Sequence, residues 1–90
     1  MSQALLRITG HVQGVFYRDN AQAQAQALGL TGYIKNMPDH SVEALAQGEK
    51  EKIQAFAEWC KQGSSSAKVE NVEISWQEPE KTFNSFEITY

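Results

Sequence analysis

Residues 5–30 read LLRITGHVQGVFYRDNAQAQAQALGL, a strand pattern that passes through two glycines into a helix pattern. From Leu5 to Val12 apolar and polar residues alternate, which predicts a half-buried strand. Residues 19–28 are rich in Ala and Gln, both good helix formers, and Gly29 stands at a natural helix end. This stretch therefore predicts a strand, a short glycine-bearing loop and a helix.

Two strand-like runs follow at residues 31–37 and 41–47, and the turn-rich segment 38–40 between them predicts a hairpin. After Gly48, apolar residues recur at helical spacing on one face, which predicts a second helix. These residues are Ile53, Phe56, Ala57 and Cys60. Because Cys60 lies on this apolar face, we expect it to be a small core residue and not a reactive thiol.

Two more strands are predicted at residues 69–76, with an irregularity near Glu70-Asn71, and at residues 83–90. The element order is then βαββαβ plus a short C-terminal strand. This order predicts an α+β, ferredoxin-like fold, with an antiparallel sheet and two helices on one face, in a single domain over residues 1–90. RNA binders, metal chaperones and enzymes all use this plan, so the fold alone names no function.

The overall composition narrows the classes of partner. The chain has 90 residues and a net charge of −3, which argues against a general nucleic-acid binder. A single cysteine allows no intramolecular disulfide and no thiolate metal cluster, which fits a reducing compartment. No run approaches the roughly 20 apolar residues of a membrane span. We therefore expect a cytoplasmic protein without a nucleic-acid or membrane partner, and a monomer as the simplest state.

The chemistry is concentrated in the loop Gly10–Arg18, which runs straight into the predicted first helix. Such a junction exposes unpaired main-chain N–H groups beside the positive end of a helix dipole, which favours a bound anion. Gly14 would let the backbone curl around phosphate oxygens, and the Arg18 guanidinium could bind two of them. From the residues alone a second interpretation stays open, in which Gly14 only makes a turn and the Arg18 side chain is a solvent-exposed charge at the start of the helix.

Two motifs resemble the signatures of the acylphosphatase family. The first is the string Gly10-x-Val12-Gln13-Gly14-Val15-x-Tyr17-Arg18, which is similar to the phosphate-loop signature at every fixed position. The second is a Gly-aromatic-small-x-Asn strand followed by a turn, a Val and a later Gly. It is matched by Gly32, Tyr33, Ile34, Lys35, Asn36, Val42 and Gly48. Two long signatures at this separation are highly specific.

The chain departs from the family pattern at two positions. Ile34 stands where the family usually has a smaller apolar residue, which we expect to affect only packing. His40 replaces the glycine that is usual in the hairpin turn. If that turn still needs a positive φ, the substitution costs on the order of 1 kcal/mol.

The resemblance implies a hydrolase that acts on acid anhydrides, splitting small acyl phosphates into carboxylate and inorganic phosphate without a metal or other cofactor. Inorganic phosphate or other anions would bind as product or inhibitor. It also implies that Arg18 binds the phosphoryl group and that Asn36 positions the attacking water. The implied phosphate-binding residues are Gln13, Gly14, Val15, Phe16, Tyr17 and Arg18. Asn36 shares its strand parity with Ile34, so we expect both side chains on the helix-covered side of the sheet.

Three other functions stay open at this point. An RNA-binding module on the same plan would need exposed aromatic residues in paired sheet motifs and a basic surface, and the sequence shows neither. A catalytically silent phosphate-binding or interaction module is disfavoured by the presence of both Arg18 and Asn36. The chain could also be a free-standing relative of the acylphosphatase-like domain of larger carbamoyl-phosphate-processing proteins.

Overall fold

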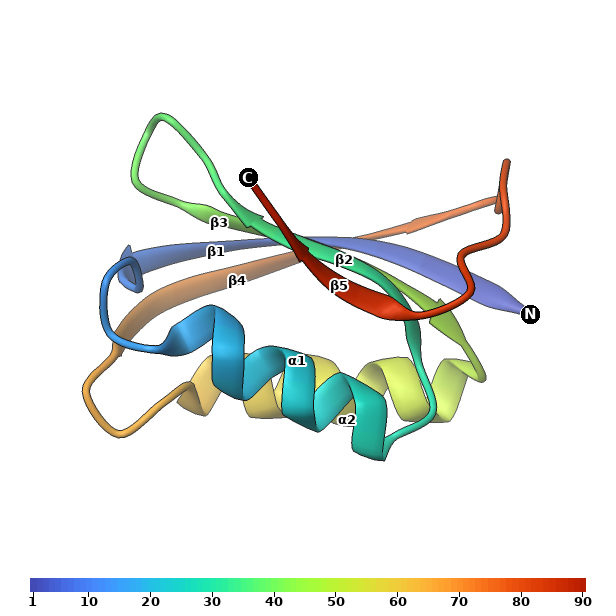
Figure 1. Ribbon diagram of the computed structural model, residues 1–90, viewed down its shortest axis with the longest axis horizontal. Coiled ribbons are helices and arrows are strands. Elements are labelled where there is room, and N and C mark those ends of the chain that lie inside the picture. Colours follow the sequence, from blue (N-terminus) through green and yellow to red (C-terminus); the bar gives the residue numbers. More distant parts are fainter.

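Seven elements make up the computed structural model, which describes residues 1–90. They are β1 (Ser2–His11), α1 (Tyr17–Ala27), β2 (Thr31–Asn36), β3 (Val42–Gly48), α2 (Lys50–Gln62), β4 (Lys68–Gln77) and β5 (Phe86–Thr89). The strands form one sheet in the order β4-β1-β3-β2-β5. Figure 1 shows both helices against one face of this sheet and the other face open. The predicted ferredoxin-like fold is thus confirmed.

The sheet is antiparallel except at one edge. β1 pairs with β3 and β4, and β3 pairs with β2, all in antiparallel register. β5 lies parallel to β2, with Gly32 opposite Phe86 and Lys35 opposite Thr89. The chain leaves β4 at one edge and crosses to the opposite edge, so β5 enters beside β2 in the same direction. The predicted antiparallel sheet is confirmed for β1 to β4, and the short C-terminal strand adds one parallel pair at its edge.

The last strand is also shorter than the sequence pattern suggests. Alternation predicted a strand over 83–90, but β5 covers only Phe86–Thr89. Phe83 instead lies against the open face of the sheet: its N–H donates to Gln47 Oε1 at 3.1 Å, and its ring centroid is 5.9 Å from that of Tyr33. Residues 83–85 thus belong to the connection that crosses the sheet. Their main chain bonds to the Gln47 side chain and, at Ser85 O, to the Gly32 N–H, and neither bond is part of the β2–β5 strand pairing.

The core between sheet and helices is built from small residues as much as large ones. Ala21 and Ala25 are buried on α1, and Ala44 and Ala46 of β3 are buried in the same core. Small side chains on a helix allow it to lie close to the elements that it covers. The large buried side chains on which they pack include Leu6, Ile8, Ile34, Ile53, Phe56 and Phe86. Neither helix is long and apolar enough to cross a membrane.

Cys60 is fully buried on the apolar face of α2, as its position in the helical pattern predicted. Burial raises the pKa of its thiol to about 12, so the nucleophilic thiolate is scarce at neutral pH. The prediction that Cys60 is a core residue is confirmed.

The first helix ends as its sequence indicated. The N–H of Leu30 donates to Ala25 O at 2.9 Å and that of Gly29 to Gln26 O at 3.0 Å, which is the hydrogen-bond pattern of a Schellman cap. The irregularity near Glu70-Asn71 is confirmed too. Pairing shifts so that Asn71 lies opposite Thr9 and Val69 opposite Gly10, which leaves Glu70 as a bulge.

The β2–β3 turn is held by a carboxylate. Asp39 accepts hydrogen bonds from the Ser41 N–H at 3.0 Å and the Ser41 hydroxyl at 2.5 Å, and Arg7 donates to its other oxygen at 2.6 Å. These bonds, the Ser41 hydroxyl first, hold the pKa of the Asp39 carboxyl well below its usual range. The next residue, His40, has a φ of 74°. The turn therefore keeps the left-handed residue that the family usually provides as glycine, and His40 bears the strain.

We expect His40→Gly to raise the free energy of unfolding by about 0.5–1 kcal/mol. Glycine removes a left-handed strain of about 1–2 kcal/mol, and part of this gain is offset because glycine loses more chain entropy on folding. Urea unfolding of both proteins measures the difference, with His40→Ala as the control that keeps a Cβ. An equal midpoint for His40→Gly and His40→Ala would contradict the strain argument.

Candidate active site

The predicted phosphate loop lies at one end of the molecule, together with the β2–β3 turn and the loop before β4 (Figure 1). Its backbone turns through two left-handed residues, Gly14 with φ 73° and Phe16 with φ 62°. Phe16 is the N-cap of α1, so the helix begins at Tyr17, two residues before the start predicted from composition. The earlier start brings Tyr17 and Arg18 into the first helical turn, where their amides point out of the helix end.

An unbroken run of main-chain N–H groups, from residue 13 to residue 19, donates to no acceptor in the protein. The first amide after this run is that of Asn20, which donates to Phe16 O at 3.2 Å. Four free amides are expected at any helix start, and here the loop before the helix extends the run. These groups lie at the positive end of the α1 dipole, so the arrangement is suited to binding an anion.

Two side chains tie the phosphate loop to the surrounding protein. Gln13 Nε2 donates to the carbonyls of Met37 at 3.0 Å and Ser41 at 2.9 Å. On the other side, Ser64 Oγ donates to Val15 O at 2.7 Å. We did not predict either role from the sequence. Ser64 lies in a serine run that carries no such signal, and Gln13 was assigned only for its main-chain N–H.

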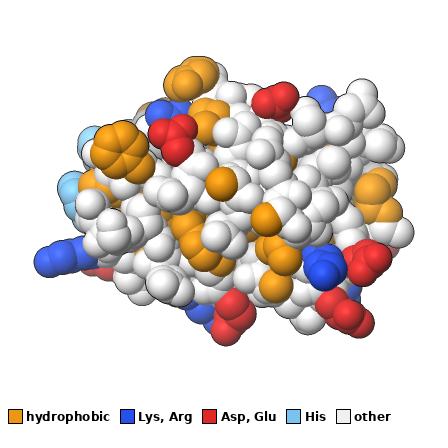
Figure 2. Space-filling model, turned by 60° about the horizontal axis from the view of Figure 1, so that its bottom comes forward, with side chains coloured by type: hydrophobic (Ala, Val, Ile, Leu, Met, Phe, Trp, Pro, Cys, Tyr) orange, Lys and Arg blue, Asp and Glu red, His pale blue; other side chains and the backbone are white.

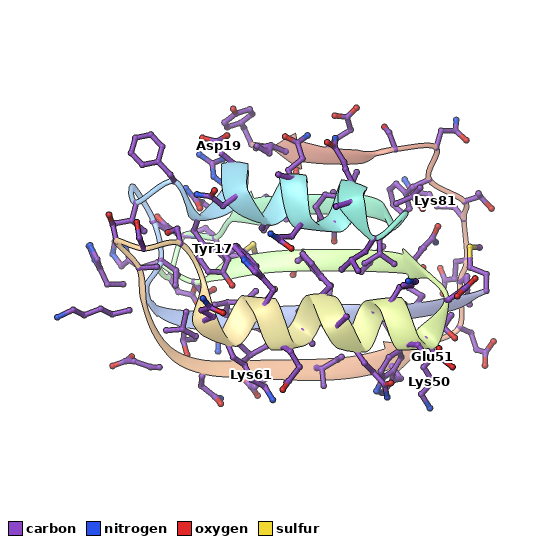
Figure 3. All side chains as sticks on the ribbon, turned by 90° about the horizontal axis from the view of Figure 1, so that it is seen from below. Tyr17, Asp19, Lys50, Glu51, Lys61 and Lys81 are labelled. Atoms are coloured by element: carbon purple, nitrogen blue, oxygen red, sulfur yellow. The ribbon has the colours of Figure 1, made fainter.

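Tyr17 is predicted to bind phosphate. In the structure its hydroxyl and its main-chain N–H point to different surroundings. Its side chain points between the helices (Figure 3), where the hydroxyl donates to Cys60 O at 2.8 Å and the ring lies 5.4 Å from that of Trp59. Burial raises the pKa of the phenol far above its ordinary value, so it stays a neutral donor. Only the N–H of Tyr17 is therefore available to an anion, and the side chain anchors the helix start.

Arg18 borders a hollow of about 270 Å³ in front of the loop. The hollow is lined by Val12, Gly14, Phe16, Tyr17, Arg18, Asp19, Ile88 and Tyr90. Arg18 is half-buried and forms no ion pair with a carboxylate, and its Cζ lies 5.0 Å from the centroid of the Tyr90 ring. A guanidinium without a carboxylate partner, beside main-chain amides that have no acceptor in the protein, favours the binding of an anion in the hollow.

Asn36 is the last residue of β2 and lies at the same end of the molecule. It has the parity of the fully buried Ile34, on the side that the alternation predicted. Its Oδ1 is buried and accepts no hydrogen bond from the protein. An unsatisfied buried carbonyl oxygen is costly and rare, so this atom is suited to accept from a molecule that enters the site. Gln13 links the two parts, since it binds the carbonyl of the next residue, Met37.

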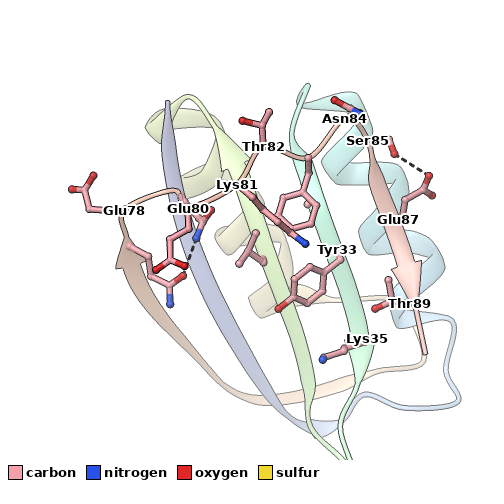
Figure 4. Close-up of a pocket in the computed structure, with 15 residues that line it drawn as sticks. Tyr33, Lys35, Glu78, Glu80, Lys81, Thr82, Asn84, Ser85, Glu87 and Thr89 are labelled. Carbon is pink, nitrogen blue, oxygen red and sulfur yellow. Dashed lines mark hydrogen bonds between the residues drawn. The ribbon is translucent and has the colours of Figure 1, made fainter.

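The largest hollow on the surface is elsewhere, on the open face of the sheet (Figure 4). Lys35 and Tyr33 of β2 and Lys81 of the crossing loop line it. Lys35 Nζ lies 3.8 Å from the Glu43 carboxylate, and Lys81 Nζ lies 4.9 Å from the Phe83 ring. Three glutamates, Glu78, Glu80 and Glu87, also line this hollow, so it is less suited to a phosphate anion than the smaller hollow beside Arg18. No cluster of three His, Cys, Asp or Glu side chains occurs anywhere in the chain.

Charge on the helix-covered side is sparse and mixed. Figure 2 shows mainly uncharged side chains over the helices, with Lys, Arg, Asp and Glu of both signs towards the margins.

Comparison with known proteins shows which family has this sequence and fold. The model of the family described as Acylphosphatase matches residues 4–88. The chain belongs to the acylphosphatase family. An acylphosphatase from Pelotomaculum thermopropionicum is 38% identical over 89 residues, which cover 99% of this chain and 97% of that protein. The crystal structure of acylphosphatase from Bacillus subtilis superimposes with a TM-score of 0.97 at 34% identity, covering 100% of both chains.

The acylphosphatase fold also occurs as part of much longer chains. The crystal structure of T. kodakarensis HypF matches all of this chain with a TM-score of 0.87 and 26% identity, but the match covers only 12% of that protein. The full-length correspondence with stand-alone acylphosphatases is therefore the more informative likeness.

Proposed function

We propose that the phosphate loop of residues 13–18, together with Asn36 at the same end of the molecule, hydrolyses small acyl phosphates to a carboxylate and inorganic phosphate. The observation that carries this proposal is the unbroken run of N–H groups without protein acceptors beside the unpaired Arg18 guanidinium. Such a site is complementary to a tetrahedral phosphate dianion. The family to which the chain belongs supplies the reaction class.

In the proposed mechanism, the loop amides and Arg18 bind the phosphoryl oxygens. Phosphoryl transfer passes through a loose transition state in which negative charge is spread over the equatorial oxygens. Fixed N–H donors stabilise this charge without reorganising, because Gln13, Ser64 and Tyr17 already hold the loop in place. No covalent step on the protein is needed.

Asn36 is proposed to orient the attacking water. Its buried Oδ1 accepts a hydrogen bond from the water, which directs an oxygen lone pair towards phosphorus. The leaving group is a carboxylate whose conjugate acid has a pKa of about 4, so it departs without a protonated side chain to assist it. This accounts for a site that combines a guanidinium, an amide side chain and main-chain donors.

A steady-state assay of phosphate release from acetyl, carbamoyl and benzoyl phosphate tests the proposal. We expect turnover of at least one of the three, with inhibition by inorganic phosphate. A folded protein that releases phosphate from none of them would overturn the enzyme and leave a phosphate-binding module.

We expect Gln13→Ala to lower kcat about tenfold and the free energy of unfolding by about 1–2 kcal/mol. The carboxamide of Gln13 ties the phosphate loop to the strand end that carries Asn36, and its loss leaves two carbonyls without this donor. Gln13→Glu is the matched control, since it keeps the shape but replaces the donor by a charge. If kcat is unchanged in Gln13→Ala while stability falls, the bond serves folding only.

We also propose that residues 1–90 act as one domain, as a monomer in the cytoplasm. A single cysteine, buried in the core, needs no oxidising compartment. Sedimentation equilibrium at micromolar concentration tests the monomer, and cell fractionation tests the location.

A further inference from the structure

Phe16 combines two unfavourable features that packing does not explain. Its backbone has φ 62° and ψ 21°, a left-handed conformation that is costly for a residue with a Cβ. Its side chain is 73% exposed, so burial of the phenyl ring contributes little to the stability of the fold. Asparagine or glycine would fit the same turn more easily. A strained, exposed aromatic residue at the mouth of a binding hollow suggests a contact that the folded chain alone does not make.

The position of Phe16 is nevertheless well defined. Its carbonyl accepts two hydrogen bonds from Asn20, one from the main-chain N–H at 3.2 Å and one from Nδ2 at 2.9 Å. The main chain on both sides is held as well, by the Ser64 bond to Val15 and by the Tyr17 hydroxyl. The ring is therefore carried on a fixed backbone, which lowers the entropy cost of using it as a contact.

Two further apolar side chains border the same hollow. Ile88 is half-buried, and Tyr90 is 98% exposed with its ring 5.0 Å from the Arg18 guanidinium carbon. Apolar surface thus begins directly beside the group that is proposed to bind phosphate. The acyl group of a bound acyl phosphate is joined to that phosphate through one oxygen, so it must lie within reach of these side chains.

The proposed in-line attack gives the direction of the acyl group. The water is held by Asn36 Oδ1, which is buried, so it approaches phosphorus from the inner side. The bond that breaks lies opposite the bond that forms, and the acyl oxygen therefore points outward. The exposed apolar side chains that border the hollow are Phe16 and Tyr90.

We propose that Phe16, with Tyr90 and Ile88 beside it, forms an acyl subsite that favours aromatic or similarly bulky apolar acyl phosphates over acetyl phosphate. This inference rests on the proposed function and names its substrate class. Offset or edge contact between the Phe16 ring and an aromatic acyl group would raise kcat/KM about tenfold relative to an acyl group too small to reach it.

The test compares the ratio of kcat/KM for two substrates in each variant, so that any effect of a Phe16 substitution on the loop, which acts on both substrates alike, cancels. For the wild type we expect a ratio of kcat/KM for benzoyl phosphate to that for acetyl phosphate well above one. Phe16→Ala and Phe16→Gly should each lower the ratio about tenfold, whereas Phe16→Tyr, which keeps a ring, should preserve it. The Gly variant also relieves the backbone strain, so agreement between Ala and Gly assigns the effect to the ring.

A binding measurement separates this inference from the proposed function. Calorimetry with phenylphosphonate and methylphosphonate needs no turnover, and we expect the phenyl compound to bind more tightly to the wild type than to Phe16→Ala, relative to the methyl compound. Turnover of both substrates with a ratio that Phe16→Ala leaves unmoved overturns the subsite alone. A wild type that hydrolyses neither substrate overturns the proposed function, and the acyl subsite with it.

Discussion

Arg18→Ala is expected to lower kcat/KM for acyl phosphates by at least about 10³-fold and to abolish measurable binding of inorganic phosphate. The guanidinium is the one charged donor at the hollow, and no carboxylate neutralises it. Its bonds to the phosphoryl oxygens strengthen as charge develops in the transition state, where loss of one such group costs about 10²–10⁵-fold. Steady-state kinetics and phosphate titration by calorimetry measure the two effects.

Arg18→Lys is the matched control for charge. Lysine keeps the positive charge but cannot bind two oxygens in a planar fork, so we expect weak phosphate binding to return with little of the turnover. Because the Arg18 side chain forms no hydrogen bond or ion pair and contacts only the exposed Tyr90 ring at 5.0 Å, neither variant should lower the unfolding midpoint appreciably. Near-normal kcat/KM in Arg18→Ala would show that the loop amides bind the phosphoryl group without it.

Asn36→Ala is expected to lower kcat by about 10²–10³-fold while inorganic phosphate still binds. The carboxamide acts on the water and the loop acts on the phosphate, so the substitution removes positioning of the nucleophile and leaves the anion site. Parallel measurements of kcat and of the inhibition constant of phosphate check this separation.

Stability distinguishes this role from a structural one. Asn36 Oδ1 has no donor in the folded protein, so Asn36→Ala removes an unsatisfied buried acceptor and should leave the free energy of unfolding unchanged or raise it by up to about 1 kcal/mol. A structural asparagine would instead destabilise the protein when lost. Wild-type kcat in Asn36→Ala would refute the water-positioning role.

One side chain joins the proposed phosphate loop to the strand end that carries Asn36. Gln13 lies in the loop and reaches the carbonyls of Met37 and Ser41, on either side of the turn that Asp39 and Arg7 stabilise. The separation between the loop amides and Asn36 therefore depends on the shape of the β2–β3 turn. Strain at His40 is tolerated there because this network holds the turn from both faces.

Much of this architecture follows from local patterns in the chain. Period-two alternation places Asn36 on the side of Ile34, and the Ala and Gln run followed by Gly29 and Leu30 specifies a helix and its Schellman cap. The glycine-bearing loop before a helix start indicates an anion site with Arg18 beside it. Such features involve residues within a few positions of each other, so one stretch of sequence contains the whole signal.

Other features depend on residues that are distant along the chain. β5 pairs with β2 because the chain crosses the sheet, and alternation cannot show the direction of that pairing. The same holds for Gln13, whose side chain reaches a turn more than twenty residues away, and for Ser64, which holds Val15. Whether Arg18 and Asn36 are left without partners, and whether Phe16 is exposed, depends on every neighbour in space. Only the packed chain brings those neighbours together.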